Sequence, residues 1–206
     1  LNTLHTAHGR ALPFATGVKM TRPEFAVFVF MGDGDCAAIG GNHFIHACRR
    51  NMDMTAIIIN NYIYGMTGGQ YSPLTPQNSR ASTASRGTME RPFDMTELAR
   101  VAGATYTARA TTYHVNLLSK LICDGANHKG FSFIEAVTAC PVAFGRRNKM
   151  GSPYDMLMWQ KEHGVPVQKA EKLTPEELQG KFVIGELYRT EAPEFTETYQ
   201  RLIEGA

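Results

Sequence analysis

Continuous apolar runs alternate along this chain with stretches whose apolar residues recur about every three to four positions, as on a helix face. Residues 25–31 and 54–59 are apolar runs rich in Phe, Val and Ile, and each predicts a buried strand. Between them, residues 42–51 place Phe44 and Cys48 on one helical face and Arg49 on the other, which predicts a helix.

The second half of the chain repeats this alternation. Asp94 and Glu97 predict a capping box at the start of a helix that Gly103 ends. Strands are predicted over residues 106–111, 131–137 and, at a sheet edge, 182–187, and helices over residues 115–122, 155–162, from 174 and over 194–204. Buried strands that alternate with helices predict an α/β fold with a doubly wound, mostly parallel sheet, in one domain that spans residues 1–206.

One long segment interrupts the pattern. Residues 62–91 are rich in Gly, Ser, Thr and Pro and contain no clear element. A segment of this length without regular structure inside a compact domain is usually functional. Doubly wound sheets bind ligands at the carboxyl ends of their strands, so we look for chemistry in the residues that follow each predicted strand.

Charge and hydropathy exclude several classes of protein. The 206 residues include 21 basic and 19 acidic side chains, and this net charge of +2 gives no electrostatic reason to expect nucleic acid or a membrane surface as a partner. The longest apolar run is too short to cross a bilayer, which needs roughly 20 residues, and the chain does not open with a signal peptide. We therefore expect a cytoplasmic protein. Its first residue is Leu, so we also expect that a preceding segment is missing.

The four cysteines are irregularly spaced and form no C-x-x-C pair, which is not the pattern of a secreted disulfide scaffold. We expect Cys36, Cys48 and Cys123 to be reduced thiols buried as small apolar groups. Cys140 differs, because it lies just beyond the predicted strand at residues 131–137.

The first predicted strand is followed by Gly32-Asp33-Gly34-Asp35, which formally matches the start of a dinucleotide-binding fingerprint. A carboxylate between the two glycines would repel a pyrophosphate unless a cation lay between them. The second strand ends in Asn60-Asn61, where a dinucleotide site needs Asp or Glu for the ribose. Both features fit a diphosphate held through Mg²⁺, with Asp33 and Asn61 as oxygen ligands. The alternative is a Gly-Asp turn that only joins a strand to a helix.

These residues and three further blocks resemble one known family, the beta subunits of the 2-oxoacid:ferredoxin oxidoreductases. The GDG…NN spacing is similar to the thiamine diphosphate motif, and the GGNH version of the first block resembles the 2-oxoglutarate type. The resemblance covers about residues 1–162 and rests on four blocks, HTAHGRALP (5–13), residues 32–53, NNYIYGMTGGQYSP (60–73) and CPVAFGRRNKMGS (140–152).

The resemblance implies a role for each matching residue. Asp33 and Asn61 would bind Mg²⁺ through their side chains, and Ile63 through its carbonyl. The residues implied to lie along or around thiamine diphosphate are Gly32, Gly34, Asp35, Ile39, Gly40, Tyr64, Gly65, Met66, Thr67 and Gly68. His8 and Arg10 would face the cofactor as catalytic candidates. His5 could lie near the substrate or could simply cap a loop, and Met66 could be a plain core residue.

The resemblance also implies the activity. It is the coenzyme A-dependent oxidative decarboxylation of a 2-oxoacid to acyl-CoA and CO₂ with one-electron transfer to ferredoxin, or the reverse carboxylation. Cys140 would be one ligand of a 4Fe–4S cluster whose other ligands lie upstream of Leu1, since a cluster needs four thiolates. An alpha subunit, in an α₂β₂ heterotetramer, would supply the Glu that activates thiamine diphosphate.

Two other functions stay open at this point. One is a non-redox thiamine diphosphate decarboxylase or synthase, for which the CPVAFGRRNK block has no use. The other is a non-catalytic diphosphate-binding module that serves assembly, which the completeness of the GDGD, NN and YGMTGG blocks disfavours. An inert thiol is likewise the alternative for Cys140.

Overall fold

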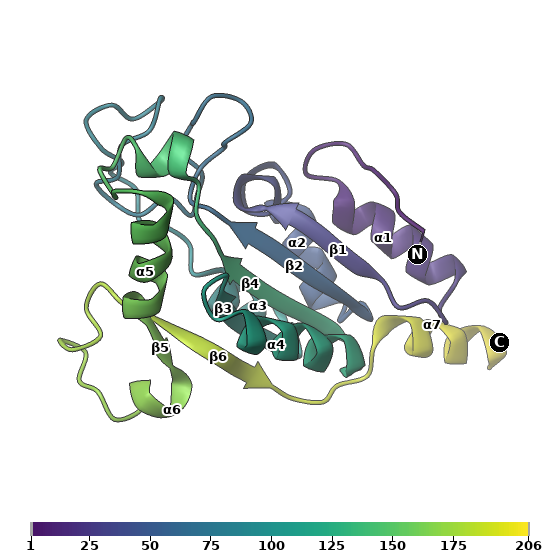
Figure 1. Ribbon diagram of the computed structural model, residues 1–206. Helices are drawn as coiled ribbons and strands as arrows, with labels where there is room; N and C mark the ends of the chain where they lie inside the picture. Colours follow the sequence, from purple (N-terminus) through teal and green to yellow (C-terminus); the bar gives the residue numbers. More distant parts are fainter. Residues whose placement is uncertain (1, 206) are drawn as a thin grey trace.

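The fold is built around one six-stranded sheet with the strand order β1-β2-β4-β3-β6-β5, in a computed structural model that describes residues 2–205 (Figure 1). The strands β1 (Phe28–Gly32), β2 (Met54–Asn60), β4 (Phe131–Val137) and β3 (Tyr106–Thr111) are parallel. The strand β6 (Phe182–Arg189) is antiparallel to β3 and parallel to the short β5 (Gly164–Pro166). The predicted α/β class with a mostly parallel sheet is confirmed.

Helices cover both faces of the sheet. On one face lie α1 (Ala11–Thr21), α2 (Gly41–Arg49) and α3 (Met95–Ala102), and the core between them and the sheet includes Phe44, Phe131 and Phe133. On the other face α4 (Val115–Asn127) packs against β2, β3 and β4. In β1, Val29 and Met31 point into this core and the residues beside them point away from it, which is the period of two expected of a strand.

The outer end of the second face has no helix over it within residues 2–205. Phe28 and Phe30 of the edge strand β1 point to this face, as does Ile59 of β2, and Phe30 is 65% exposed. These three side chains form an apolar patch, because α4 reaches only as far as β2.

The remaining elements lie at the two ends of the sheet. The helices α5 (Pro153–His163) and α6 (Val167–Ala170) flank β5, and α7 (Phe195–Glu204) closes the chain. Two π-helical turns occur among the described residues, η1 (Asp35–Ile39) and η2 (Pro141–Gly145), and each begins a few residues after a strand end. Such turns are frequent at functional sites.

Several sequence-based predictions were wrong in detail. The helix α1 was not predicted, β6 is an inner strand rather than an edge, and the residues after Thr174 form turns rather than a helix. Thr174 and Glu177 do bond each other's backbone N–H groups as a capping box, but Gly180 adopts a positive φ of 75° after little more than one turn. With no side chain of that turn buried, nothing stabilises a longer helix.

Two smaller expectations also need correction. Asp94 caps α3 by accepting the N–H groups of Thr96 and Glu97, but the Glu97 side chain binds Arg100 instead of completing a capping box. Cys36 and Cys48 are fully buried as expected, whereas Cys123 is exposed, because it lies on the outer side of α4.

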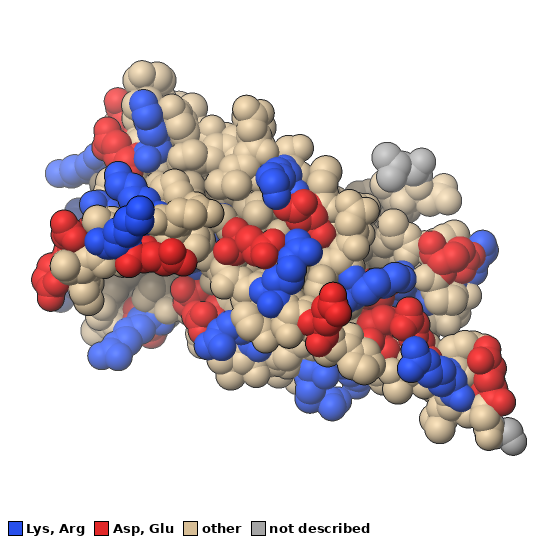
Figure 2. Space-filling model, turned by 90° about the horizontal axis from the view of Figure 1, so that it is seen from below, with Lys and Arg blue, Asp and Glu red and all other residues tan. Residues whose placement is uncertain are grey.

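Residues 62–91 form the long loop that the sequence predicts, with only two isolated bridges, Tyr64 to Gln70 and Ala81 to Ala84. None of the helices in residues 2–205 combines the length and the apolar character that a membrane crossing needs. Basic and acidic side chains are interspersed on the face of the molecule shown in Figure 2.

Candidate functional site

The candidate site lies where β1 and β2 end side by side. Gly32 pairs with Ile59 in the parallel register, so Asp33 and Asn60 are the next residues of neighbouring strands. The side chain of Asp33 is almost completely buried, and the hydroxyl of Ser72 donates a hydrogen bond to it. Burial raises the pKa of the Asp33 carboxyl to about 6, against the smaller opposing effect of the Ser72 hydrogen bond.

The chain turns sharply after β2. The side-chain oxygen of Asn60 accepts the N–H of Tyr62 at 3.1 Å, and that of Asn61 accepts the N–H of Ile63 at 3.2 Å. These two consecutive Asx turns hold Tyr62 at a positive φ of 65°, which residues other than Gly adopt only when the surroundings fix it. The second lone pair of the Asn61 oxygen stays available.

The long loop braces both of these strand ends. Ser72 reaches Asp33, and the Thr75 hydroxyl donates to the carbonyl of Tyr62 at 2.6 Å and accepts the Ser72 N–H at 2.8 Å. Both side chains are buried. The loop segment 72–75 therefore fixes the Asp33 carboxylate and the Asn61 turn relative to each other.

A chain of polar contacts that is buried except at Asp94 supports the same turn from beneath. The amide nitrogen of Asn60 donates to Glu135 of β4 at 2.7 Å, and Glu135 is paired with Arg109 of β3, also at 2.7 Å. Arg109 contacts Asp94 at the start of α3, again at 2.7 Å. Although burial opposes its charge, Glu135 and Asp94 raise the pKa of the Arg109 guanidinium, so it stays charged.

Gly34 allows the loop to approach the strand end closely. The Tyr64 hydroxyl donates to the Gly34 carbonyl at 2.9 Å, and a Cβ added at Gly34 would overlap the Tyr64 ring. The structure thus brings the GDG motif and the YGMTGG loop into direct contact.

The N-terminal segment joins the same cluster. Nδ1 of His8 lies 2.7 Å from the Asp35 carboxylate, which also accepts the N–H of Gly9, and the His8 ring packs edge-on against Tyr64. A Cβ at Gly9 would collide with Ile39 and press against Gly40, so this segment lies directly on η1.

The other predicted residues surround this cluster less tightly. Arg10 precedes α1 and its guanidinium reaches the His8 carbonyl at 3.5 Å, whereas His5 is exposed and makes no hydrogen bond to a described residue. The structure does not bring His5 to the cluster. Gly65, Met66, Thr67 and Gly68 form the exposed tip of the loop. The full exposure of Met66 contradicts its reading as a core residue.

Cys140 lies across from this loop tip. It precedes η2, where its carbonyl accepts the N–H groups of Phe144 and Gly145. A Cβ added at Gly65 would lie 3.6 Å from its sulfur, so the thiol is in contact range of the loop. Its partial exposure distinguishes it from the fully buried Cys36 and Cys48.

The residues at the strand ends fit a magnesium ion and a diphosphate. Asp33 is a buried carboxylate with no basic side chain within 4 Å among the described residues, and amide and carbonyl oxygens follow β2 directly beside it. Mg²⁺ takes such oxygen donors together with phosphate oxygens. No group of three or more His, Cys, Asp or Glu side chains that could hold a metal ion comes together within residues 2–205. Asp33 is the carboxylate of the candidate ligand set, and the other oxygens of that set are uncharged.

Sequence reasoning missed four supporting residues: Ser72, Thr75, Arg109 and Glu135. Arg109 and Glu135 did carry a signal, because each is a charged residue in the middle of a predicted buried strand, and the two are direct partners in the register of β3 and β4. Opposite charges on buried strands are expected to pair. Ser72 and Thr75 lie in a segment without periodicity and gave no such signal.

Comparison with known proteins places this geometry in a family. Residues 1–136 match the family of the thiamine pyrophosphate enzyme C-terminal TPP-binding domain. The chain is 53% identical over 203 residues to 2-oxoglutarate synthase subunit KorB of Methanocaldococcus jannaschii, covering 98% of this chain and 75% of that protein. It is 37% identical over 167 residues to 2-oxoglutarate oxidoreductase subunit KorB of Mycobacterium tuberculosis, covering 79% and 44%.

A solved structure is similar over the same extent. The 2-oxoglutarate:ferredoxin oxidoreductase of Magnetococcus marinus, solved with 2-oxoglutarate, coenzyme A and succinyl-CoA bound, superposes with a TM-score of 0.85 at 32% identity, covering 98% of this chain and 69% of that one. The sequence resemblance is therefore confirmed by sequence and by fold. The chain belongs to the thiamine pyrophosphate enzymes and, among them, to the KorB beta subunits of the 2-oxoglutarate:ferredoxin oxidoreductases.

Proposed function

We propose that this chain binds thiamine diphosphate and Mg²⁺ and provides one half of the active site that converts 2-oxoglutarate, coenzyme A and oxidised ferredoxin to succinyl-CoA, CO₂ and reduced ferredoxin, or runs the reverse carboxylation. The observation that carries the proposal is the buried Asp33 carboxylate, which has no basic partner within residues 2–205 and lies beside the Asn60–Asn61 turn. A carboxylate is buried at such cost only where a cation or a proton compensates it.

In this proposal the strand ends hold the metal. Asp33 and Asn61 are side-chain ligands and Ile63 is a backbone ligand, and residues 1–206 form one thiamine diphosphate-binding domain. The diphosphate lies along Gly32, Gly34 and Asp35, and the remaining contacts come from Ile39, Gly40 and Tyr64 to Gly68. When bound, thiamine diphosphate supplies a nucleophilic carbon and accepts the electron pair that decarboxylation releases.

His8 and Arg10 of the N-terminal segment are the residues proposed to bind and orient the substrate. The contact between His8 and Asp35 fixes the imidazole against Tyr64, so one ring nitrogen is directed at the carboxylate and the other faces away from it. The Arg10 guanidinium makes one long contact, 3.5 Å, to the carbonyl of His8, so its other donors are free of partners within residues 2–205. We assign His8 and Arg10 to the substrate side of the site, and His5, which the structure leaves outside the cluster, is the weakest member of this set.

Cys140 is proposed as a ligand of a 4Fe–4S cluster that passes electrons one at a time to ferredoxin. Its sulfur lies in contact range of Gly65, at the tip of the loop assigned to the cofactor. Short distances favour one-electron transfer, and a partly exposed thiol is accessible to a cluster, whereas a fully buried one is not.

The partner is proposed to be the alpha subunit, in an α₂β₂ assembly. No described Glu side chain makes a hydrogen bond or ion pair to a residue proposed to contact the cofactor, and Glu135, which reaches the neighbouring Asn60, is also paired with Arg109. The acid that activates the cofactor would therefore come from the other subunit. Apolar side chains left uncovered on β1 are consistent with a chain that functions in a complex.

The experiment is to assay the chain alone and after assembly with its alpha subunit. We expect 2-oxoglutarate-dependent reduction of a viologen dye, together with succinyl-CoA formation, only in the assembled complex supplied with thiamine diphosphate and Mg²⁺. The complex that carries Asp33→Ala serves as the cofactor-free control.

Each competing function predicts a different result. Release of succinic semialdehyde and CO₂ without dye reduction would identify a non-redox decarboxylase. Tight thiamine diphosphate binding without turnover of any 2-oxoacid would identify an assembly module. Turnover by the beta chain alone would contradict the shared active site.

A further inference from the structure

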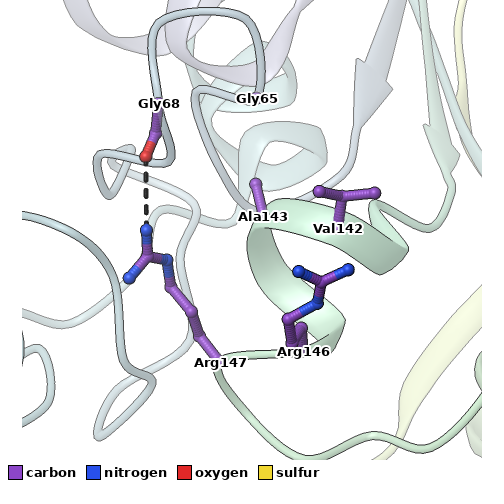
Figure 3. A pocket seen from close by; sticks show the side chains of 6 residues that line it. All are labelled: Gly65, Gly68, Val142, Ala143, Arg146 and Arg147. Carbon is purple, nitrogen blue, oxygen red and sulfur yellow. Dashed lines mark hydrogen bonds between the residues drawn. The ribbon is translucent and has the colours of Figure 1, made fainter.

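A cavity of about 340 Å³ opens between the tip of the long loop and η2 (Figure 3). Two glycines, the small apolar side chains of Val142 and Ala143, and two arginine side chains line it (Figure 3). Gly69 lies beside the cavity, where an added Cβ would be in ordinary contact with Arg147 at 3.4 Å and with Ala143 at 3.5 Å. The lining residues are Gly65, Gly68, Val142, Ala143, Arg146 and Arg147.

The two arginines carry charge that no described residue neutralises. Neither Arg146 nor Arg147 has a carboxylate within 4 Å in residues 2–205, and the side-chain hydrogen bond of Arg147 goes to the Gly68 carbonyl at 3.5 Å. A long and weak bond of this kind leaves most of the guanidinium donors of Arg147 free. Both side chains are exposed and can reach a ligand without a desolvation cost.

The surroundings strengthen this positive field. We define the basic lobe as residues 62–91 and 140–151, which contain six Lys or Arg and one Asp or Glu, for a formal charge of +5, whereas the other residues sum to −3. The lobe is one packed unit, since Asn148 exchanges hydrogen bonds with the backbone of Arg80 and Phe144 packs with Ile63 and Ala81. Charge of one sign around a cavity attracts a ligand of the opposite sign.

The cavity also lies next to the chemistry. Gly65 belongs both to its wall and to the loop assigned to the cofactor, and the Cys140 sulfur is within 3.6 Å of the place where a Gly65 Cβ would be. A molecule that binds with its anionic end at Arg146 and Arg147 can therefore extend a narrow arm along Val142 toward the loop tip. Such a molecule has phosphate groups at one end and a slender, uncharged reactive end.

We propose that this cavity is the phosphate-binding subsite for the acyl acceptor, with Arg146 and Arg147 holding phosphate oxygens of coenzyme A while its thiol arm reaches the loop tip. This inference rests on the proposed function, which requires a phosphate-bearing thiol at the reaction centre. Arginine forks suit phosphate oxygens because two N–H groups bind in parallel. A basic lobe could instead bind an acidic electron-carrier protein, and separate measurements of coenzyme A and ferredoxin binding distinguish the two ligands.

The test uses the assembled complex with Arg146→Gln and Arg147→Gln, singly and together. Binding of desulfo-coenzyme A, which cannot react, is measured by calorimetry, and steady-state kinetics are measured for each substrate. We expect the dissociation constant for desulfo-coenzyme A and the KM for coenzyme A to rise about tenfold per arginine, while kcat and the KM for 2-oxoglutarate stay the same. Arg147→Lys should restore part of the affinity. The matched control is Lys149→Met, which removes a neighbouring charge outside the cavity lining.

The possible results distinguish failure of the proposed subsite from failure of the proposed activity. Unchanged desulfo-coenzyme A affinity in the double variant overturns the subsite, and so does a rise confined to the KM for ferredoxin, which would identify a docking surface for an acidic protein instead. If the wild-type complex binds desulfo-coenzyme A in an Arg146- and Arg147-dependent way but does not turn over 2-oxoglutarate, the subsite stands and the proposed activity fails.

Discussion

The amide nitrogen of Asn60 lies 2.7 Å from a carboxylate oxygen of Glu135, so the turn that follows β2 is anchored to the middle of the sheet. Glu135 in turn neutralises Arg109, its direct partner across β3 and β4. Asn60 is thereby connected to the helix cap at Asp94 through one line of contacts, which is buried as far as Arg109 and reaches the surface at Asp94.

Glu135→Gln tests this line. Gln can still accept from Asn60 but leaves Arg109 with one carboxylate instead of two, and removing one partner from a buried pair typically costs about 3 kcal/mol or more. We expect a loss of that size in the free energy of unfolding, measured by urea titration. The control is Glu186→Gln, whose partner Arg189 is exposed, and there we expect less than about 1 kcal/mol. Equal losses at both positions would mean that burial of the pair has no special weight.

Asp33 should control the pH dependence of the cofactor-free chain. Its carboxyl has a pKa of about 6 in the fold against the ordinary value of 3.8, so between these values the unfolded state is ionised and the folded state holds the proton. Stability is then lost as pH rises through this window and stays lost above it. The penalty is about 3 kcal/mol at pH 8, at roughly 1.4 kcal/mol per pKa unit.

Asp33→Asn removes the titrating group and retains an acceptor for Ser72. We expect the cofactor-free variant to be more stable than the wild type at pH 8 by part of that penalty, and equally stable at pH 4. Urea titrations at the two pH values measure the difference. A variant that is less stable than the wild type at pH 8 would show that the carboxylate is not strained by burial.

In the complex with Mg²⁺ and thiamine diphosphate bound, the Asp33 carboxylate is expected to stabilise the protein rather than to destabilise it. Asp33→Ala removes the charged ligand proposed for Mg²⁺, so we expect thiamine diphosphate affinity in the assembled complex to fall at least about a hundredfold, with Asp33→Asn less affected. Calorimetry with Mg²⁺ present gives the affinities. An unchanged affinity in Asp33→Ala would remove Asp33 from the metal site.

Gly34→Ala tests the contact between the GDG motif and the long loop. The added methyl group overlaps the Tyr64 ring, so the ring has to move away and lose its bond to Gly34, and the cofactor affinity should fall by about tenfold or more. Gly41→Ala is the matched control, because its Cβ meets no atom within 4 Å and Ala favours the start of α2. Tyr64→Phe separates the ring from the hydrogen bond to Gly34, and we expect a smaller loss there.

Cys140→Ser addresses the cluster. In the full complex we expect iron and sulfide content to fall and ferredoxin reduction to stop, while thiamine diphosphate binding survives, because its ligands are on other strands. Iron analysis and paramagnetic resonance measure the cluster. Cys123→Ser, on the outer side of α4, is the control and should change neither. A Cys140→Ser complex with full iron content would return Cys140 to the inert-thiol alternative.

The particular elements show what the sequence can and cannot predict. The strands β2 and β4 were found because they are buried almost throughout and are therefore mostly apolar. The strand β1 was found because it is apolar as well, although its Phe28 and Phe30 face is uncovered. The helix α1 was missed because its pattern is inverted. Lys19 is buried, where it pairs with Asp53 at 2.7 Å, and Phe14 is half exposed. A periodicity search treats such a lysine as a surface residue.

The candidate site likewise has one part that the sequence predicts and one part that it does not. The GDGD and NN blocks were placed correctly side by side because parallel strands end at the same edge, which topology alone dictates. The contacts of Ser72 and Thr75 depend on the path of a loop that has no period, and the pairing of Arg109 with Glu135 depends on the register of β3 against β4. Loop path and register are three-dimensional facts that one sequence does not state.

The uncovered patch on β1 has a practical consequence for handling the protein. Phe28 and Phe30 stand on an edge strand whose outer backbone groups have no strand partner within residues 2–205, so apolar surface and free hydrogen-bonding groups coincide. An edge strand with this combination can pair with a strand of another chain. Preparations of the beta chain alone will accordingly lose monomer as concentration rises, and synthesis of both subunits in the same cell is the route to homogeneous material.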